Sequence, residues 1–378
     1  MTRPVVRPRK LLFFVTEDWY FVSHRLPLAI AAKDAGYEVS VVTRVRADGE
    51  AIRASGLRLI PFENSRSGIN PFAEFWTLVR LIALYRRERP DVVHHVAMKP
   101  VLYGSLAARM AGTRHVVNAL AGMGWLFSSG AGLARWLKPM VRWGLGRLLQ
   151  SGISLVQNRD DARLLTQLGV PASRVRRIAG SGVDLQRFVP HPEPSGDPLI
   201  VLPARLLWDK GVGEFVAAAR SLKQKGVAAR FVLAGEPDAA NPSSVTPDQI
   251  AKWIEEGVVE HPGWVRDMPR LLTQSCVVCL PSFYGEGIPK SLIEAAAAGR
   301  PIITTDMPGC REIVHHGDNG LLVPARDAAA LAQSLEWLLN DPALRRQMGT
   351  RGRARAEAEF GLAAVIEQTL VLYAETAV

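Results

Sequence analysis

The 378-residue sequence has few cysteines, and their arrangement argues against a disulfide framework. An odd, sparse set of Cys276, Cys279 and Cys310 indicates a reducing compartment. The first two form a Cys-x-x-Cys spacing inside an apolar run that is typical of a buried strand. Because a zinc site requires four ligands and no second pair follows, we interpret them as core cysteines.

Long apolar segments are also lacking. The run Leu11–Val15 is soon followed by Glu17, so it is too short for a signal-peptide core and predicts the first strand. The stretch from His115 to Ala134 lacks Asp, Glu, Lys and Arg but contains Asn118 and several glycines. It therefore predicts a strand and a loop rather than a membrane-spanning helix. We expect a cytoplasmic protein.

Compact cofactor motifs are missing as well. The chain contains neither a Gly-x-Gly-x-x-Gly fingerprint nor a P-loop, so the sequence gives little support for a dinucleotide fold or a P-loop enzyme. No Asp-x-Asp occurs, and this is the carboxylate pair that commonly holds Mg²⁺ or Mn²⁺. We therefore expect a mechanism with no metal and no cofactor.

Charge is distributed unevenly. Residues 1–190 contain 28 Lys and Arg against 13 Asp and Glu, a net charge of +15, whereas residues 191–378 contain 18 against 23, a net charge of −5. A basic half suggests an anionic lipid, a nucleic acid or a phosphorylated acceptor as partner. No helix-turn-helix or aromatic–basic RNA motif is present, so we expect no nucleic acid. A non-enzymatic basic protein that binds membrane or nucleic acid stays an alternative.

Short β-branched runs alternate with helical segments along the whole chain, which indicates parallel sheets covered by helices on both faces. A Pro/Gly-rich stretch from Phe188 to Gly196 predicts a linker between two doubly wound domains, residues 1–190 and 191–378. The helical segment Pro342–Val378 closes the second domain or packs back on the first. The expected strands are 10–16, 37–43, 57–63, 91–96, 115–120 and 154–158, then 199–206, 229–235, 263–265, 276–281, 301–305 and 320–323.

The segment from Pro281 to Ala295 carries the first chemical signal. A buried strand ends at Pro281, a glycine-flanked turn carries Glu286, and a helix is expected to begin at Pro289. Backbone N–H groups near a helix start favour an anion, and Glu294 can accept hydrogen bonds from a ribose diol. Taken singly, each glutamate is better explained as a solvated charge, but together they indicate a nucleotide site. The other residues expected to contact the ligand are Gly287, Ile288, Pro289 and Lys290.

A second signal follows the first strand of the second half, on the same carboxyl edge. Arg205 can bind phosphate oxygens with its guanidinium fork, and Lys210 can add a point charge. Two cations can neutralise a diphosphate leaving group without a metal ion.

Arg205 with Lys210, and Glu286 seven residues before Glu294, together resemble the donor site of the retaining glycosyltransferases of family 4. The resemblance covers most of the C-terminal half. It implies the GT-B fold, in which two Rossmann-like doubly wound α/β domains face each other across a cleft, and a UDP-sugar donor. Base choice, uridine over guanosine, rests on the family alone.

The same resemblance implies roles for individual residues. Arg205 and Lys210 would hold the diphosphate, Glu286 the hydroxyls of the donor sugar and Glu294 the ribose. The catalytic group is therefore Arg205, Lys210 and Glu286, and the segment with Val265 and Arg266 would face the base.

The N-terminal half is similar to one branch of the family, the enzymes that extend undecaprenyl-diphosphate-linked saccharides in bacterial surface or protein glycan assembly. The resemblance implies an acceptor-binding, membrane-facing first domain, a nucleotide-sugar-binding second domain, and transfer of an N-acetylhexosamine or related hexose. Two departures are a missing glycine pair after the first strand and the lack of a histidine at positions 118 and 121. Strand alternation should bury one histidine of the pair 94–95. The acceptor-side candidates are Trp19, His24, His94, His95, Lys99 and Asn118.

Residues 134–150 place basic side chains beside Trp and Leu, as an interfacial helix requires. This pattern predicts a peripheral protein on the inner face of the bacterial cytoplasmic membrane, although an ordinary amphipathic surface helix would look similar. The membrane-facing candidates are Arg135, Trp136, Lys138, Arg142 and Trp143.

A nucleotide-sugar epimerase or a phosphorylase with the same two-domain layout is a further alternative. The cofactor-lysine motif of a phosphorylase is not seen in the sequence.

Overall fold

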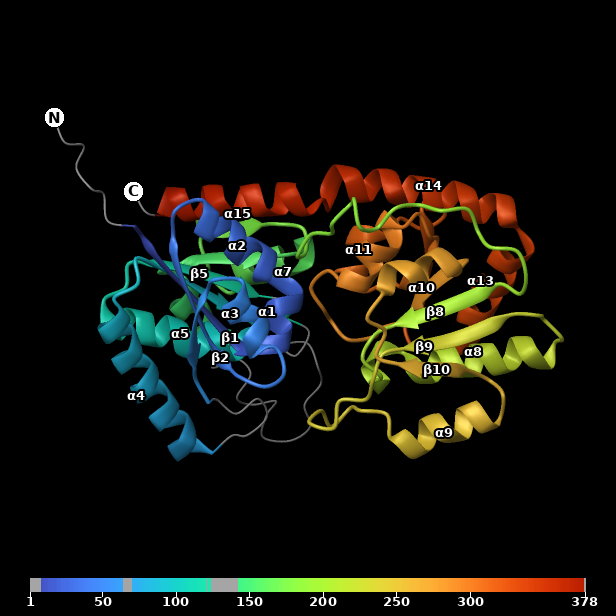
Figure 1. Cartoon of the computed structure of the whole chain (residues 1–378), viewed down its shortest axis with the longest axis horizontal. Helices are drawn as coiled ribbons and strands as arrows, with labels where there is room; N and C mark the ends of the chain where they lie inside the picture. The colour runs from blue at the N-terminus through green and yellow to red at the C-terminus, as the bar shows by residue number, and fades with distance from the viewer. Residues whose placement is uncertain (1–7, 64–69, 121, 124–141, 377–378) are drawn as a thin grey trace. The chain divides into compact units, whose positions relative to one another are not determined.

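The computed structural model describes residues 8–63, 70–120, 122–123 and 142–376. The chain divides into two compact units: residues up to Ser181 together with those from Ala364 onward, and residues Gly182–Ala363 (Figure 1). The boundary expected at residue 190 therefore lies inside the second unit, and the end of the chain belongs to the first.

The first unit is built on a seven-stranded sheet with strand order β3-β2-β1-β4-β5-β6-β7, and its strand pairings are parallel. Residues 142–149 are also helical. The elements are β1 Lys10–Glu17, α1 Asp18–His24, α2 Leu26–Asp34, β2 Glu38–Arg44, α3 Gly49–Ala54, β3 Arg58–Pro61, α4 Pro71–Glu88, β4 Val92–Val96, α5 Met98–Ala111, β5 His115–Leu120, β6 Ile153–Val156, α7 Arg159–Gln167, η2 Ala172–Arg174, β7 Val175–Arg177 and α15 Leu362–Thr376.

The second unit is built on a six-stranded sheet with strand order β10-β9-β8-β11-β12-β13, again with parallel pairings. The elements are β8 Leu199–Pro203, η3 Trp208–Lys210, α8 Val212–Gln224, β9 Arg230–Ala234, α9 Pro247–Glu255, β10 Glu260–Gly263, α10 Met268–Gln274, β11 Val277–Leu280, α11 Lys290–Ala297, β12 Ile302–Thr305, α12 Cys310–Ile313, β13 Gly320–Val323, α13 Ala328–Asn340 and α14 Pro342–Glu359.

Both faces of the first sheet are buried, because successive side chains of each strand point to opposite faces. Phe13 on one face joins a cluster that includes Leu372 and Tyr373 of α15. Phe14, the next residue of β1, packs on the other face with Tyr85 of α4. The near-continuous apolar runs in the sequence are thus explained by helices on both sides, and the predicted doubly wound α/β fold is confirmed.

Some expected element boundaries are wrong. The strand expected at 263–265 lies earlier, at Glu260–Gly263, and β7 was not expected. Pro289 is the N-cap residue of α11 rather than its first helical residue, because its ψ of 121° is extended. The C-terminal helical segment is broken into α14 and α15 around Phe360 and Gly361.

The three cysteines are free and buried, as expected of core residues. Among the residues that the structure describes, no helix has the length and apolar character needed to cross a membrane.

Candidate functional site

Two loops at the carboxyl edge of the second sheet are held together by backbone contacts. The strands that precede them, β8 and β11, are neighbours in the sheet. Gly211 has a φ of +76°, and a Cβ atom added there would lie 2.2 Å from the carbonyl oxygen of Pro281. The N–H of Phe283 donates to the carbonyl of Asp209 at 3.0 Å. Only glycine suits this conformation and this close approach, so residue 211 fixes the distance between the two loops.

The contact between the loops brings Lys210 and Glu286 together as an ion pair. Glu286 Oε1 also accepts a hydrogen bond from Ser282 Oγ at 2.8 Å. The Lys210 and Glu286 side chains are only 15% and 18% exposed, so water screens the pair incompletely. Two of the residues predicted from widely separated motifs therefore meet at one place.

The turn that carries Glu286 is also pressed against the start of α12. Gly309 has a φ of +81°, and a Cβ atom there would lie 1.7 Å from the carbonyl oxygen of Gly287. A side chain at position 309 would therefore displace the turn. This close packing explains why a glycine follows Pro308 after β12.

Arg205 lies in the same β8 loop and pairs with a residue that the sequence analysis missed. Its Nη1 atom lies 2.6 Å from Oδ2 of Asp238, with side-chain exposures of 34% and 16%. The N–H of Leu206 donates to the carbonyl of Glu236, and that of Val245 donates to the carbonyl of Leu206. The loop after β9 therefore wraps around the Arg205 loop. An acidic residue just after a neighbouring strand was the available signal for Asp238.

Glu294 lies in α11 with its side chain 13% exposed, and Lys290 Nζ is 3.6 Å from its Oε1. Burial raises the pKa of Glu294, while the positive charges of Lys290 and Arg187 act in the opposite direction. Arg187 lies just before the segment predicted as the linker, Phe188–Gly196. It is a second cation near Glu294 that the motifs did not reveal.

Two further candidates, Val265 and Arg266, lie in the loop after β10, because this strand ends at Gly263 and not at residue 265 as expected. Val265 packs against the small cluster formed by β8 and β9. Arg266 is exposed, and the neighbouring Trp264 is 66% exposed.

In the first unit the structure buries both histidines of β4. Strand alternation predicted the burial of one of them, and both are buried because helices cover both faces of this sheet. His95 is bonded through Nδ1 to Asn118 Oδ1 at 2.7 Å and through Nε2 to the Tyr85 hydroxyl at 3.0 Å. His94 Nδ1 lies 2.5 Å from the Tyr373 hydroxyl.

This environment keeps both imidazoles neutral. Desolvation lowers the pKa of His95 to about 4, and lowers that of His94 well below its usual value. Since Asn118 Oδ1 can only accept, His95 carries its proton on Nδ1 and accepts from Tyr85 at Nε2. His94, His95 and Asn118 thus have structural partners inside the unit.

The other acceptor-side candidates lie nearer the surface. Trp19 is half-buried at the start of α1. His24 stacks on Tyr20 with ring centroids 4.2 Å apart, and its Nδ1–H donates to the Tyr20 carbonyl at 3.2 Å. Lys99 pairs with Glu74 at 2.7 Å.

Two of the five membrane-facing candidates lie among the described residues. Arg142 is half-buried, and Trp143 is 67% exposed at the start of the helical residues 142–149. Arg135, Trp136 and Lys138 lie outside the described residues. In the described part of the chain, no group of three or more His, Cys, Asp or Glu residues is arranged to hold a metal ion.

Two family profiles match the chain. Residues 185–355 match the profile described as glycosyl transferases group 1, and residues 10–150 match the profile described as glycosyl transferase 4-like. The two matches cover most of both units, and the first contains all the residues of the β8 and β11 loops.

Two glycosyltransferases are similar to this chain over nearly their full lengths. One is the N,N'-diacetylbacillosaminyl-diphospho-undecaprenol alpha-1,3-N-acetylgalactosaminyltransferase of Campylobacter jejuni, 28% identical over 92% of this chain and 94% of that protein. The other is EpsD of Bacillus subtilis (strain 168), which carries the name of a glycosyltransferase and is 30% identical over 97% of this chain and 96% of that protein.

Solved structures agree on the fold. The structure of HepE (Alr3699) from Anabaena with UDP and glucose has a TM-score of 0.78 at 17% identity, covering 97% of this chain and 99% of that one. With a named glycosyltransferase at 30% identity along almost the whole chain and both profiles in the same order as the two units, the protein belongs to the group 1, family 4-like glycosyltransferases of GT-B fold.

Proposed function

We propose that the protein is a retaining, metal-independent hexosyltransferase that moves a sugar, an N-acetylhexosamine or related hexose, from a UDP-sugar to a polyprenyl-diphosphate-linked saccharide in bacterial glycan assembly. The observation that carries the proposal is the meeting of the Arg205–Lys210 loop with the Glu286 turn at one edge of the second sheet. The names of the Campylobacter relative and of the Anabaena complex support the acceptor class and the UDP donor.

In this proposal the second unit binds the donor. Arg205 and Lys210 bind the diphosphate oxygens, and the backbone from Gly287 to Lys290 at the start of α11 adds N–H donors and a favourable helix dipole. Glu286 accepts hydrogen bonds from the hydroxyls of the donor sugar, and Glu294 accepts them from the ribose. Val265 and Arg266 lie against the base.

Transfer breaks the bond between the anomeric carbon and the β-phosphate oxygen, and UDP leaves with the bonding electron pair. The acceptor hydroxyl oxygen forms the new bond on the same face of the sugar, and its proton passes to the departing phosphate oxygen. The configuration is therefore retained. Arg205 and Lys210 stabilise the charge that develops on the diphosphate, and electrostatic stabilisation of this kind is usually the largest catalytic contribution.

The first unit binds the acceptor in this proposal. Trp19, His24 and Lys99 are its candidate contacts, whereas the burial of the β4 histidines and Asn118 favours a supporting role for those three. Exposed Trp143 and the basic composition of this half support binding to an anionic lipid surface on the inner face of the cytoplasmic membrane. Arg135, Trp136, Lys138 and Arg142 would contribute there.

The test begins with a thermal-shift screen of nucleotide sugars. A stabilising nucleotide sugar is then used, radiolabelled in its sugar, for transfer to extracted polyprenyl-linked lipids. We expect UDP to raise the melting temperature and label to enter the lipid fraction. Unchanged melting with saturating UDP would favour a non-enzymatic protein, and conversion of the UDP-sugar without any lipid would favour an epimerase.

A further inference from the structure

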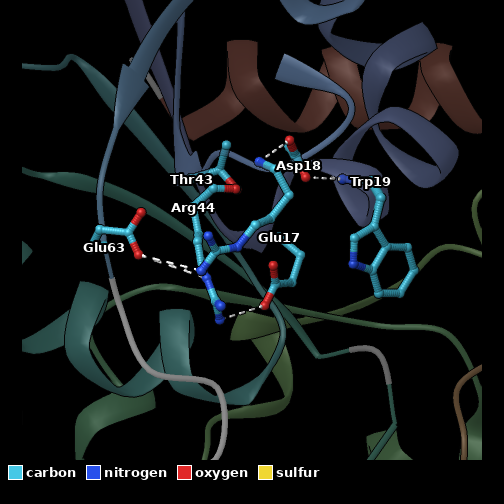
Figure 2. Close-up of polar contacts among 7 residues, drawn as sticks. Glu17, Asp18, Trp19, Thr43, Arg44 and Glu63 are labelled. Carbon is cyan, nitrogen blue, oxygen red and sulfur yellow. Dashed lines mark hydrogen bonds and ion pairs between the residues drawn. The ribbon is translucent and has the colours of Figure 1, made fainter. Parts of the chain in front are cut away.

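The carboxyl edge of the first sheet holds a group of charged side chains that no sequence motif indicated. β1 ends at Glu17 and β2 ends at Arg44, and these two residues are paired across the strands just after an irregularity in the register. Figure 2 shows them beside Glu63, with Trp19 following in α1. Ligands of open parallel sheets bind at this edge, and strand irregularities often redirect side chains there.

Asp18 fixes the backbone on which this group is built. Its side chain is fully buried and accepts three backbone N–H hydrogen bonds, from Trp19 at 2.8 Å, Arg46 at 2.6 Å and Asp48 at 3.0 Å. The first, drawn in Figure 2, joins the carboxylate to its own helix start, and the other two join it to the loop after β2. Because a buried carboxylate needs such partners, the two loops are held in one arrangement.

The ion pairs among the charged side chains of this group are long. Arg44 Nη1 lies 3.4 Å from Glu17 Oε1, Arg44 Nε lies 3.7 Å from Glu63 Oε2, and Arg46 Nη2 lies 3.9 Å from the same oxygen. At the amino edge of the same sheet, by contrast, Arg58 bonds Glu88 at 2.6 Å.

One atom of this group lacks a hydrogen bond altogether. Arg44 Nε is buried with no hydrogen-bond partner in the described structure. A buried N–H without an acceptor is destabilising, so a ligand oxygen that supplies the acceptor would recover that energy. Asp18 holds the backbone of this group in place, while the Arg44 side chain still has an N–H to donate. A binding site for an oxygen-rich ligand would have both features.

The balance of charge identifies the class of ligand. The group contains two carboxylates and two guanidinium groups, so it offers no net attraction to a phosphate, and Glu17 would repel one. A vicinal diol suits it better, because one hydroxyl can donate to Glu17 while another accepts from Arg44. The half-buried ring of Trp19 adds an apolar surface on which the face of a sugar ring can lie.

We propose that Glu17, Arg44, Arg46 and Glu63, with Trp19, form a subsite for a neutral saccharide, the sugar portion of the acceptor rather than its diphosphate. This inference rests on the proposed function, since it names the part of the acceptor that the first unit recognises. Glu17, Arg44 and Trp19 contact the sugar, and Asp18 is a positioning residue beneath them.

The test measures saccharide binding directly, by saturation-transfer difference NMR on the full chain with saturating UDP. The probes are methyl glycosides of glucose, galactose, N-acetylglucosamine and N-acetylgalactosamine. We expect saturation transfer to at least one of them, a loss of about tenfold in apparent affinity in Glu17→Gln and in Arg44→Gln, and retention in Trp19→Phe but not in Trp19→Leu. Inorganic diphosphate should not displace the glycoside.

The matched control is Arg58→Gln, which breaks an Arg–Glu pair at the opposite edge of the same sheet and should bind the glycoside like the wild type. Absence of binding to every glycoside, equal binding by Glu17→Gln and the wild type, or displacement by diphosphate would each overturn the subsite. UDP stabilisation is measured on the same samples. Its absence would count against the proposed function and leave the glycoside result to be read separately.

Discussion

Replacing Arg205 with alanine separates the proposed catalytic role of this residue from its contribution to stability. In transfer assays we expect kcat/KM to fall by about 10²–10³, which corresponds to the loss of roughly 3–4 kcal/mol of transition-state stabilisation. The physical reason is that the guanidinium carries charge-assisted hydrogen bonds to the departing diphosphate, each contributing about 1.5–3 kcal/mol. Its removal also takes away a positive charge that lies 2.6 Å from the Asp238 carboxylate.

The expected effect of the same change on folding is small. Arg205 is 34% exposed, and alanine would remove its ion pair with Asp238. Partly exposed ion pairs contribute about 0.2–1 kcal/mol. Since a loss of about 1 kcal/mol lowers the melting temperature of a unit of this size by about 2–4 °C, the shift should not exceed that range. We therefore expect Arg205→Ala to lose most of its transfer activity while its folding stability stays close to that of the wild type.

Arg230→Ala is the matched control. Arg230 begins β9 and forms a bidentate pair with Glu260 at the start of β10, with N···O distances of 2.8 and 2.7 Å. This pair lies at the amino edge of the sheet whose carboxyl edge holds Arg205. Its loss should cost a similar amount of stability and leave transfer unchanged.

The assay is initial-rate transfer of radiolabelled sugar to extracted polyprenyl-linked lipid, together with thermal melting of each variant. A double variant, Arg205→Ala with Asp238→Ala, should recover part of the UDP affinity, because the carboxylate no longer repels the diphosphate. Near-normal turnover in Arg205→Ala, or equal losses of activity in Arg205→Ala and Arg230→Ala, would refute the assignment.

The remaining predictions concern His95, two glycines and the role of metal ions. Folding lowers the pKa of His95 from 6.5 to about 4, so the neutral imidazole contributes about 3 kcal/mol to the free energy of unfolding above pH 6.5. This contribution is lost as the pH falls towards 4. Urea unfolding across this range should show the loss in the wild type and a flatter pH profile in His95→Gln. Gly104→Ala should destabilise the protein by about 2–3 kcal/mol, because its Cβ would lie 2.5 Å from the His95 ring. Gly144→Ala should instead be neutral or stabilise by up to about 1 kcal/mol, because among the described residues no atom beyond its chain neighbours and its own helix backbone lies within 4 Å of the added Cβ. The same urea unfolding compares the two variants. Transfer should continue in excess EDTA, and activity lost to the chelator but restored by Mg²⁺ or Mn²⁺ would contradict the metal-independent mechanism.

The interior strands of both sheets could be predicted from the sequence, whereas two of the edge strands, β7 and β10, were not predicted at their observed positions. Interior strands such as β5 and β12 are short apolar runs bounded by turns, and their observed ranges match the expected ones to within one residue. β7 reads Val-Arg-Arg and β10 reads Glu-His-Pro-Gly, both largely exposed at the ends of their sheets. These two edge strands bury little apolar surface, so their sequences carry little periodic signal.

The destination of the last helix shows a second limit. The apolar pattern of α15 indicates that one side of the helix is buried, but a pattern within one segment does not say which sheet buries it. In the structure Leu372 and Tyr373 join the core of the first unit, and the Tyr373 hydroxyl meets His94 of β4. A pairing across 279 residues depends on the assembled sheet and has no local trace in the sequence.

Glu17 and Asp18 show why adjacent residues of the same charge can have unrelated roles. Asp18 points inward and is saturated by backbone N–H groups from residues 19, 46 and 48. Glu17 lies at the strand end, opposite Arg44 at 3.4 Å. Which carboxylate turns inward depends on the register irregularity after Phe14 and on a loop that arrives from the next strand. Neither condition is local to the acidic pair, so chemistry at this edge follows from the fold, whereas the Lys210–Glu286 chemistry could be anticipated from two local motifs.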